Sequence, residues 1–413
     1  MTTPYTNVQF IGYAIPSIPR MIADIGSAGA PGFVEGRYTG INPAAADIDA
    51  RIALTMNAVD CTLKSGAVDP SATTLKIFLM PEFSFRGKQG TYEVDLFDHF
   101  RNEFSKRVAA PDYEGWLFVA GTIVNTTQDY VRGQNPRRDL KARIREDLMI
   151  ALTNTWQHAR ANQEPSLTQF AFNTLAAYTD YCHTDPVYEV TDKSYVVAGG
   201  APDATYPQGL TVQKKFVSGE DFVLNLFTNA HDFTEAEAAY PPIPENQGED
   251  KQTAFDDFSI FTIKGIKFGL EVCLDHAFAR LRRNRLPATE LVQIHLVPSC
   301  GMQIVQSSVV AGAGGLVFNC DGQYDGLMPT SQPGPGDSVW TGTASHRAHS
   351  QLTQVVTPCE GPHRSMHPAV LTMPGASVTT VPIEDASASE LFAYGAGEVH
   401  VYTPLPVPPP VAE

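Results

Sequence analysis

Apolar and polar positions along the first third of the chain fall into blocks that predict strands and helices in turn. Three runs are apolar almost throughout, as buried strands are: VQFIGYAI (8–15), KIFLMPEF (76–83) and WLFVAGTIV (116–124). Residues 47–66 instead repeat apolar side chains at every third or fourth position, as one face of a helix does: Ile52, Met56, Val59 and Leu63. Residues 91–109 predict a second helix. The order strand, helix, strand, helix, strand indicates an α/β fold.

Residues 125–205 interrupt this rhythm. Apolar side chains four positions apart predict a helix over 137–161, namely Leu140, Ile144, Leu148 and Leu152. A second helix is expected over 166–182. We interpret 125–205 as a helical insertion on the scaffold; a lid over an active site, a contact between subunits and simple padding all stay open. The strand pattern resumes at TVQKKFV (211–217).

The remainder of the chain also alternates. Residues 258–273 predict a hairpin whose second arm ends in a tight turn at Cys273. Further elements are expected in this order: a basic helix (277–286), a buried strand (291–299), and a helix end with another strand (309–322). The proline-rich end, TPLPVPPPVAE (403–413), predicts an extended tail outside any sheet.

The charge of the chain narrows the possible partners. Its 413 residues carry a formal net charge of −16. An acidic surface repels phosphate backbones and anionic lipids, so we expect no nucleic-acid partner and no membrane partner. No apolar run approaches the roughly 20 residues that span a bilayer, and the first residues lack the pattern of a signal peptide. We therefore expect a cytoplasmic protein.

The cysteines do not predict a disulfide scaffold or a zinc site. The six are widely scattered and form no CxxC pair: Cys61, Cys182, Cys273, Cys300, Cys320 and Cys359. Disulfide scaffolds are short and rich in cysteine, and zinc ligands usually come in close pairs. We expect no metal and no organic cofactor.

One cysteine nevertheless stands in a position that suits catalysis. Cys273 lies between a predicted strand and a predicted helix, in GLEVCLDHAF. The start of a helix favours the thiolate, and the N–H groups of the turn can donate to a developing oxyanion. The alternative is a buried cysteine that only fills space.

A nucleophilic thiol needs a proton acceptor and a group that stabilises negative charge. Glu82 directly follows a predicted buried strand, and Lys214 and Lys215 lie within another. Each could instead be an ordinary solvated residue. The two lysines point to opposite faces of a strand, so only one can serve.

The order of these residues resembles the Glu–Lys–Cys triad of the nitrilase superfamily of carbon–nitrogen hydrolases. MPEFSF resembles the family's Pro-Glu segment, and QKKFV its Arg-Lys segment, with Gln213 at the Arg place and Lys214 at the Lys place. GLEVCLDHAF resembles the family's cysteine segment and retains Gly269, Cys273, Asp275 and Phe278. HLVPS resembles the family's strand that ends in Pro-Ser. The resemblance spans about 8–325, less the insertion. Near the cysteine the sequence departs from the family pattern, because Leu274, Ala277 and Ala279-Arg280 replace the usual residues.

The resemblance implies an α/β fold in the form of a four-layer α-β-β-α sandwich with a helical insertion. It implies a hydrolase domain over 1–325, with 326–413 as a C-terminal extension packed on the same domain. It also implies a homodimer or higher homo-oligomer.

For the site, the resemblance implies Glu82 as base, Cys273 as nucleophile, and Lys214 with the N–H of Leu274 as oxyanion donors. Asp221, or its neighbour Glu220, is expected as a second carboxylate at the substrate. His276, beside the nucleophile, is expected to line the pocket.

The reaction implied is hydrolysis of an amide or carbamoyl group in a small molecule through an acyl-enzyme. Leu274-Asp275 is closer to the amidase and carbamoylase pattern than to the Cys-Trp-Glu of true nitrilases. A nitrile hydrolase, an amide-forming acyltransferase and a non-catalytic scaffold remain alternatives.

Overall fold

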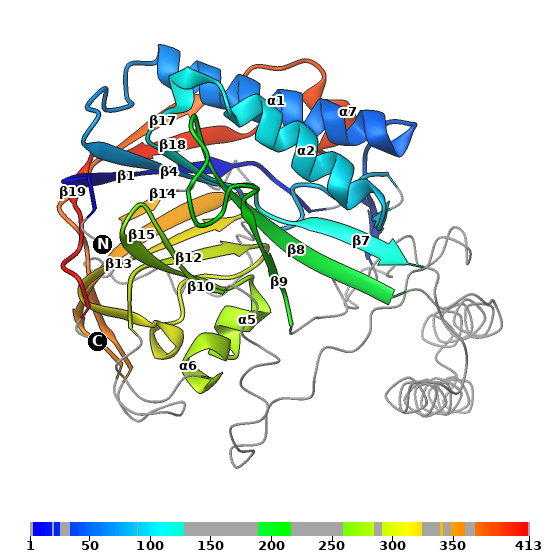
Figure 1. Ribbon diagram of the computed structural model, residues 1–413. Coiled ribbons are helices and arrows are strands. Elements are labelled where there is room, and N and C mark those ends of the chain that lie inside the picture. Colours follow the sequence, from blue (N-terminus) through cyan, green and yellow to red (C-terminus); the bar gives the residue numbers. More distant parts are fainter. Residues whose placement is uncertain are drawn as a thin grey trace, which may run out of the picture.

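Two β-sheets packed face to face form the centre of the computed structural model (Figure 1). The structure describes residues 3–18, 20–24, 34–88, 90–127, 189–215, 259–284, 291–323, 339–341, 348–359 and 368–411. The protein is an α/β protein, as the alternating pattern predicts.

Within the described residues, the first sheet has ten strands and is built around the parallel strands β1, β4 and β6. Its order is β17 (Val378–Pro382), β18 (Glu398–Tyr402), β1 (Asn7–Ala14), β4 (Thr74–Leu79), β6 (Trp116–Val119), β8 (Glu189–Ala198), β7 (Ile123–Thr127) and β5 (Tyr92–Glu93). Two further strands pair with β1 and β8, respectively: β19 (Leu405–Pro406) and β9 (Leu210–Gln213).

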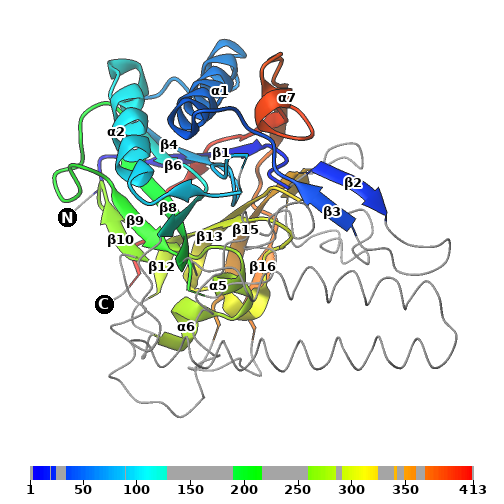
Figure 2. The same cartoon turned by 90° about the vertical axis from the view of Figure 1, so that its right-hand side faces the viewer.

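The second sheet has seven strands, among which β11, β12 and β13 run parallel. Its order is β10 (Ile260–Ile263), β11 (Ile266–Leu270), β12 (Val292–Ser299), β13 (Ala311–Asp321), β15 (His349–Thr357) and β14 (Val339–Thr341), with β16 (Val370–Thr372) paired to β15. A separate two-stranded ribbon joins β2 (Arg20–Asp24) and β3 (Val34–Arg37) beside the sheets (Figure 2).

The core lies in layers. Aliphatic and aromatic side chains of both sheets fill the space between them, where the Phe10 and Phe318 rings lie 5.0 Å apart. The outer face of the first sheet is covered by α1 (Ala44–Lys64) and α2 (Leu96–Val108), with the short α7 (Ala388–Leu391) beside them.

The outer face of the second sheet carries α5 (Leu274–Ala277) and α6 (Arg280–Asn284), which lie on the opposite side of the molecule from α1 and α2 (Figure 2). Of the predicted outer helical layer on this side, the described ranges contain these two short helices. The described ranges also contain two 3₁₀ turns: η1 (Pro111–Tyr113) and η7 (Gln306–Ser308). In the described part of the chain, no helix is long and apolar enough to cross a membrane.

Residues 116–124 form two strands and not the single strand that was predicted. The chain breaks at Gly121, whose φ is +62°. A Cβ there would overlap the carbonyl oxygen of Pro81. Only glycine combines this backbone conformation with so close an approach, and the contact presses the break against the loop that follows β4.

The prediction that 125–205 forms one insertion is wrong at both of its ends. Residues 125–127 belong to β7, and β8 is an inner strand that pairs with β6, β7 and β9. The predicted helices 137–161 and 166–182 lie outside the described residues. The sequence pattern did not predict β8, because the strand contains polar residues and its partner strands come from other parts of the chain.

Three other local predictions need correction. The predicted helix 277–286 is divided at Ala279, whose φ is +53°. Residues 311–321 are strand throughout, so the strand predicted within 309–322 is confirmed and the helix end is wrong. The predicted free tail pairs with β1 through Leu405 and Pro406, because an edge position leaves the proline nitrogen without need of a partner. Strands β15 and β18, both beyond residue 325, are inner strands of the two sheets.

Candidate active site

A buried ion pair joins two of the predicted site residues. Glu82 follows the carboxyl end of β4, and Lys214 follows β9. The Lys214 Nζ lies 2.7 Å from the Glu82 Oε1, and each side chain is only 1% exposed. Of the two candidate lysines, Lys214 is the one whose ammonium makes this contact. Charges are seldom buried so fully, because the loss of hydration costs several kcal/mol per ion.

The backbone around Glu82 is held by neighbouring loops. The next residue, Phe83, has a φ of +62°, a strained value for a side chain of this size. Its N–H donates to the Thr122 Oγ1 at 2.8 Å, and the N–H of Glu82 donates to the carbonyl of Ser299 at 3.3 Å. These bonds hold the turn that directs the carboxylate inward.

Cys273 occupies a sharp turn between β11 and α5. Its φ of 45° and ψ of −107° are unusual for a residue that is not glycine. Its N–H donates to the carbonyl of Pro298 at 3.0 Å, and its own carbonyl accepts from His276 and Ala277. The thiol lies 4.0 Å from the carbonyl oxygen of Cys300. Strained backbone of this kind persists only where the surroundings fix it, and it gathers at functional sites.

The end of β12 holds Glu82 and Cys273 at one place. Pro298 accepts the N–H of Cys273, and Ser299 accepts the N–H of Glu82. Glu82 follows the carboxyl end of β4 in the first sheet, and Cys273 follows the carboxyl end of β11 in the second. This is the end of such sheets at which ligands usually bind.

Asp275 connects the backbone next to Lys214 with the turn that carries Cys273. Its two carboxylate oxygens accept the backbone N–H of Lys215 at 3.0 and 3.2 Å. Arg280 donates to the same carboxylate at 3.3 Å, and both side chains of this ion pair are fully buried. The structure therefore brings the strand that carries Lys214 to the turn that carries Cys273.

A second cation lies close to this pair. The guanidinium of Arg86 stacks on the ring of Phe83 at 4.3 Å and on the ring of Tyr38 at 4.2 Å. The Lys214 Nζ lies 5.6 Å from the Phe83 ring. Sequence reasoning missed Arg86, although it lies four residues after Glu82.

The other predicted binding residues have different outcomes. Leu274 begins α5 and is partly buried against the apolar core between the sheets. Its N–H belongs to the first turn of a helix, where no earlier helical carbonyl can accept it. Asp221 and Glu220 lie outside the described residues.

The prediction that His276 lines the pocket does not fit its surroundings. Its side chain is fully buried. The Nδ1 lies 2.9 Å from the Glu271 Oε2, and the Nε2 accepts the N–H of Val305 at 3.0 Å. With both ring nitrogens bonded inside the protein, no polar atom of the ring is left for a substrate.

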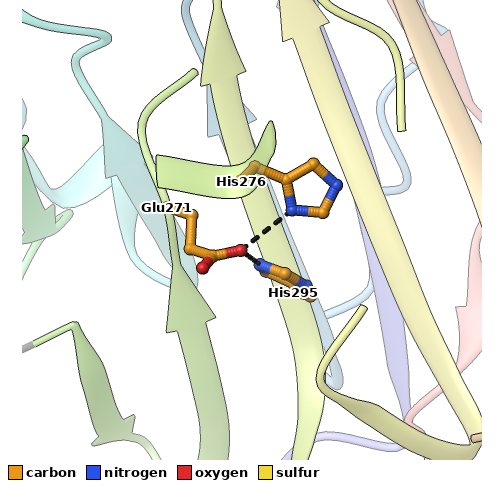
Figure 3. A group of neighbouring side chains, drawn as sticks. All are labelled: Glu271, His276 and His295. Carbon is orange, nitrogen blue, oxygen red and sulfur yellow. Dashed lines mark hydrogen bonds and ion pairs between the residues drawn. The ribbon is translucent and has the colours of Figure 1, made fainter. Parts of the chain in front are cut away.

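Glu271 is the centre of a buried cluster that the sequence did not reveal (Figure 3). His276 and His295 both approach its Oε2, the second at 3.1 Å. Burial alone would raise the pKa of Glu271, but the hydrogen bonds from the two histidines outweigh it and hold the pKa at about 2. Burial lowers the pKa of His276, against the attraction of Glu271. Within the described ranges, these three are the one set of His, Cys and carboxylate side chains whose ligand atoms lie close enough together to hold a metal ion.

Comparison with known proteins gives a distant likeness to solved structures. No family model and no curated protein matches the chain. Among solved structures, the chain is similar to an amidase from Nesterenkonia sp., at 10% identity over 78% of this chain and 77% of that one, with a TM-score of 0.32. A mutant of that amidase, described as belonging to the nitrilase superfamily, aligns at 9% identity over 78% of each chain, with a TM-score of 0.32. A mutant in complex with butyramide aligns at 11% identity over 77% of this chain and 76% of that one, also at 0.32.

Proposed function

We propose that this protein is a thiol amidohydrolase of the nitrilase type, which hydrolyses an amide or carbamoyl group of a small molecule through an acyl-enzyme on Cys273. The observation that carries the proposal is the buried pair of Lys214 and Glu82, held on the same strand end as the Cys273 turn. An ion pair so fully buried is weak evidence for stability, since apolar residues would often serve as well. A catalytic use of the pair explains why two charges are buried at this place.

The proposed reaction has two halves. In the first, Glu82 takes the proton of the thiol while the Cys273 sulfur bonds to the carbonyl carbon. The ammonium of Lys214 and the N–H of Leu274 stabilise the oxyanion. The tetrahedral intermediate collapses, the carbon–nitrogen bond breaks, and Glu82 returns the proton to the leaving ammonia or amine.

In the second half, Glu82 takes a proton from water, and the hydroxide adds to the thioester carbon. Collapse breaks the carbon–sulfur bond, releases the acid and returns the proton to the thiolate. One carboxylate therefore serves as base and acid in turn, as general acid–base catalysis allows. The paired lysine keeps the buried site close to neutral overall while it stabilises each oxyanion.

The test is ammonia release from a panel of simple amides, N-carbamoyl compounds and nitriles. Wild type is compared with Cys273→Ala and Glu82→Gln, and Cys61→Ala on α1 is the matched control. Intact-mass measurement records any acyl adduct during turnover. We expect release and an adduct with wild type and Cys61→Ala, and neither with Cys273→Ala.

Two outcomes contradict the proposal. Equal release by wild type and Cys273→Ala would show that another group is the nucleophile. Release from nitriles alone would replace the amidohydrolase by a nitrile hydrolase on the same thiol.

A further inference from the structure

The cluster of Glu271, His276 and His295 gathers five parts of the chain around the nucleophile turn. Glu271 follows β11, His276 belongs to α5 and His295 to β12 (Figure 3). All three side chains are fully buried. The loop that follows β12 and the start of α6 contribute backbone N–H groups.

The backbone donors determine which nitrogens carry protons. The Val305 N–H points at the His276 Nε2 at 3.0 Å, and the Val310 N–H points at the His295 Nδ1 at 3.4 Å. A nitrogen that accepts a hydrogen bond carries no proton, so in each neutral ring the proton lies on the other nitrogen. In both rings that other nitrogen faces the Glu271 Oε2.

The carboxylate is satisfied by the same arrangement. Its Oε2 faces the two ring N–H groups, and its Oε1 accepts the N–H of Leu281 at 2.6 Å. The carboxylate thus faces one nitrogen of each imidazole and one backbone N–H, without any added ion.

A metal ion does not fit this arrangement. An imidazole that binds a metal through one nitrogen carries its proton on the other and donates it to an acceptor. Here the outer nitrogens of His276 and His295 face N–H donors, so a metal at Glu271 would set two donors against two donors. The short distances among the three ligand atoms therefore reflect the contacts of the two rings with the carboxylate.

We propose that Glu271, His276 and His295 are positioning residues that fix the strained turn of Cys273 through neutral imidazoles. The inference rests on the proposed function, since it assigns the cluster to the nucleophile of that reaction. Glu271 precedes Cys273 by two residues and His276 follows it by three, so the cluster holds the chain on both sides of the turn. It also fixes the loop after β12, whose Cys300 carbonyl lies beside the thiol.

The arrangement makes the turn sensitive to acid. The titratable and charged groups that face His276 are Glu271 from the end of β11 and His295 from β12. A proton added to the His276 Nε2 would meet the N–H of Val305 and expel it. The loop and the turn would then separate, and the thiol would leave its working position.

The experiment follows the thiol directly. Alkylation of Cys273 by iodoacetamide, which forms a carbon–sulfur bond and releases iodide, is measured by peptide mass between pH 5 and 8, with Cys61 as internal reference. Wild type is compared with His276→Asn, which keeps a donor near Glu271 but loses the acceptor for Val305, and with the milder His295→Gln. The steady-state kcat and KM and the metal content of each purified protein are recorded in parallel.

We expect the kcat of His276→Asn to fall by about 10- to 100-fold with little change of KM, as small misplacements of a reacting group do. We also expect the acid limb of Cys273 alkylation, present in wild type, to change shape in this variant while Cys61 is unaffected. A merely structural cluster would lower stability and leave that profile as it is.

Several outcomes overturn the inference. A divalent metal bound to wild type in equal amount and lost in His276→Asn would make the cluster a metal site. Alkylation profiles that coincide in wild type and His295→Gln, if His276→Asn does not fold, would remove the positioning role. Alkylation is read at the thiol, so it decides the inference even where no amide is turned over, whereas failure of the proposed function appears in the Cys273→Ala comparison.

Discussion

The carboxylate of Asp275 accepts the backbone N–H of Lys215 with both of its oxygens. The contact joins a residue two positions after Cys273, the proposed nucleophile, to the neighbour of Lys214, which pairs with Glu82. A chain separation of 60 residues is closed by this contact. The geometry of the proposed triad therefore depends on a residue that takes no part in the proposed bond changes.

Asp275→Asn tests that dependence. The amide keeps one acceptor for Lys215 but loses the charge that balances the buried Arg280. Breaking a buried pair typically costs about 3–5 kcal/mol of unfolding free energy, and the milder asparagine should lie near the lower end. We expect kcat to fall at least tenfold, as measured by ammonia release beside urea unfolding. Asp98→Asn is the control, since its side chain is 81% exposed and its change should stay within about 0.5 kcal/mol.

Variants of Glu82 and Lys214 should show that the stability of the fold and the catalytic activity depend on this pair in different ways. Glu82→Gln leaves the Lys214 ammonium buried without its charge partner in the pair, so it should lower both the unfolding free energy and turnover, the latter by about 10²–10⁴-fold. The double variant with Lys214→Met removes both charges. It should recover stability without activity. A double variant as unstable as Glu82→Gln alone would contradict this account of the pair.

The sequence predicts best the elements whose pattern is local. Helix α1 and the β10–β11 hairpin lie where period and turn residues place them, because each repeats its apolar positions over its own length. β8 was missed because its neighbours are β6, β7 and β9, and no short window contains such pairings. The order of Glu82, Lys214 and Cys273 indicated a common site because it resembles the Glu–Lys–Cys triad, with Glu82 and Cys273 at predicted strand ends and Lys214 within a predicted strand.

His276 shows where that reasoning ends. Its place three residues after the proposed nucleophile indicated a pocket residue, but the direction of a side chain on a one-turn helix depends on what it packs against. Its partner Glu271 directly follows β11, and its partner His295 belongs to β12, 19 positions away in the chain. Such a cluster becomes visible only when the strands are placed side by side.

The pH dependence of stability follows from the same cluster. Burial lowers the pKa of His276 below its ordinary 6.5, so below that pH the unfolded chain binds a proton that the folded chain does not. The unfolding free energy should therefore decrease as the pH falls from about 6.5, by at most about 1.4 kcal/mol per pH unit for one group. The depressed pKa of Glu271, about 2 against an ordinary 4.5, adds a further loss between those values.

Urea unfolding at several pH values checks this. The pKa of the buried His349 is also lowered by burial and acts in the same direction, so the comparison must be differential. His276→Asn should show a shallower slope between pH 6.5 and 5 than wild type. Equal slopes would assign the acid sensitivity to other groups.

Gly121 provides a test of the loop that carries Glu82. Alanine at this position meets two obstacles, a φ of +62° and an overlap with the carbonyl oxygen of Pro81. Gly66 is a matched control, because its φ is +74° and nothing lies within 4 Å of the added Cβ. Gly66→Ala should therefore cost only the backbone strain, about 1 kcal/mol. Gly121→Ala should cost more and should displace Pro81 and with it Glu82, so that kcat falls while the control retains it. Equal losses of stability and unchanged kcat in both variants would show that the loop yields without moving the carboxylate.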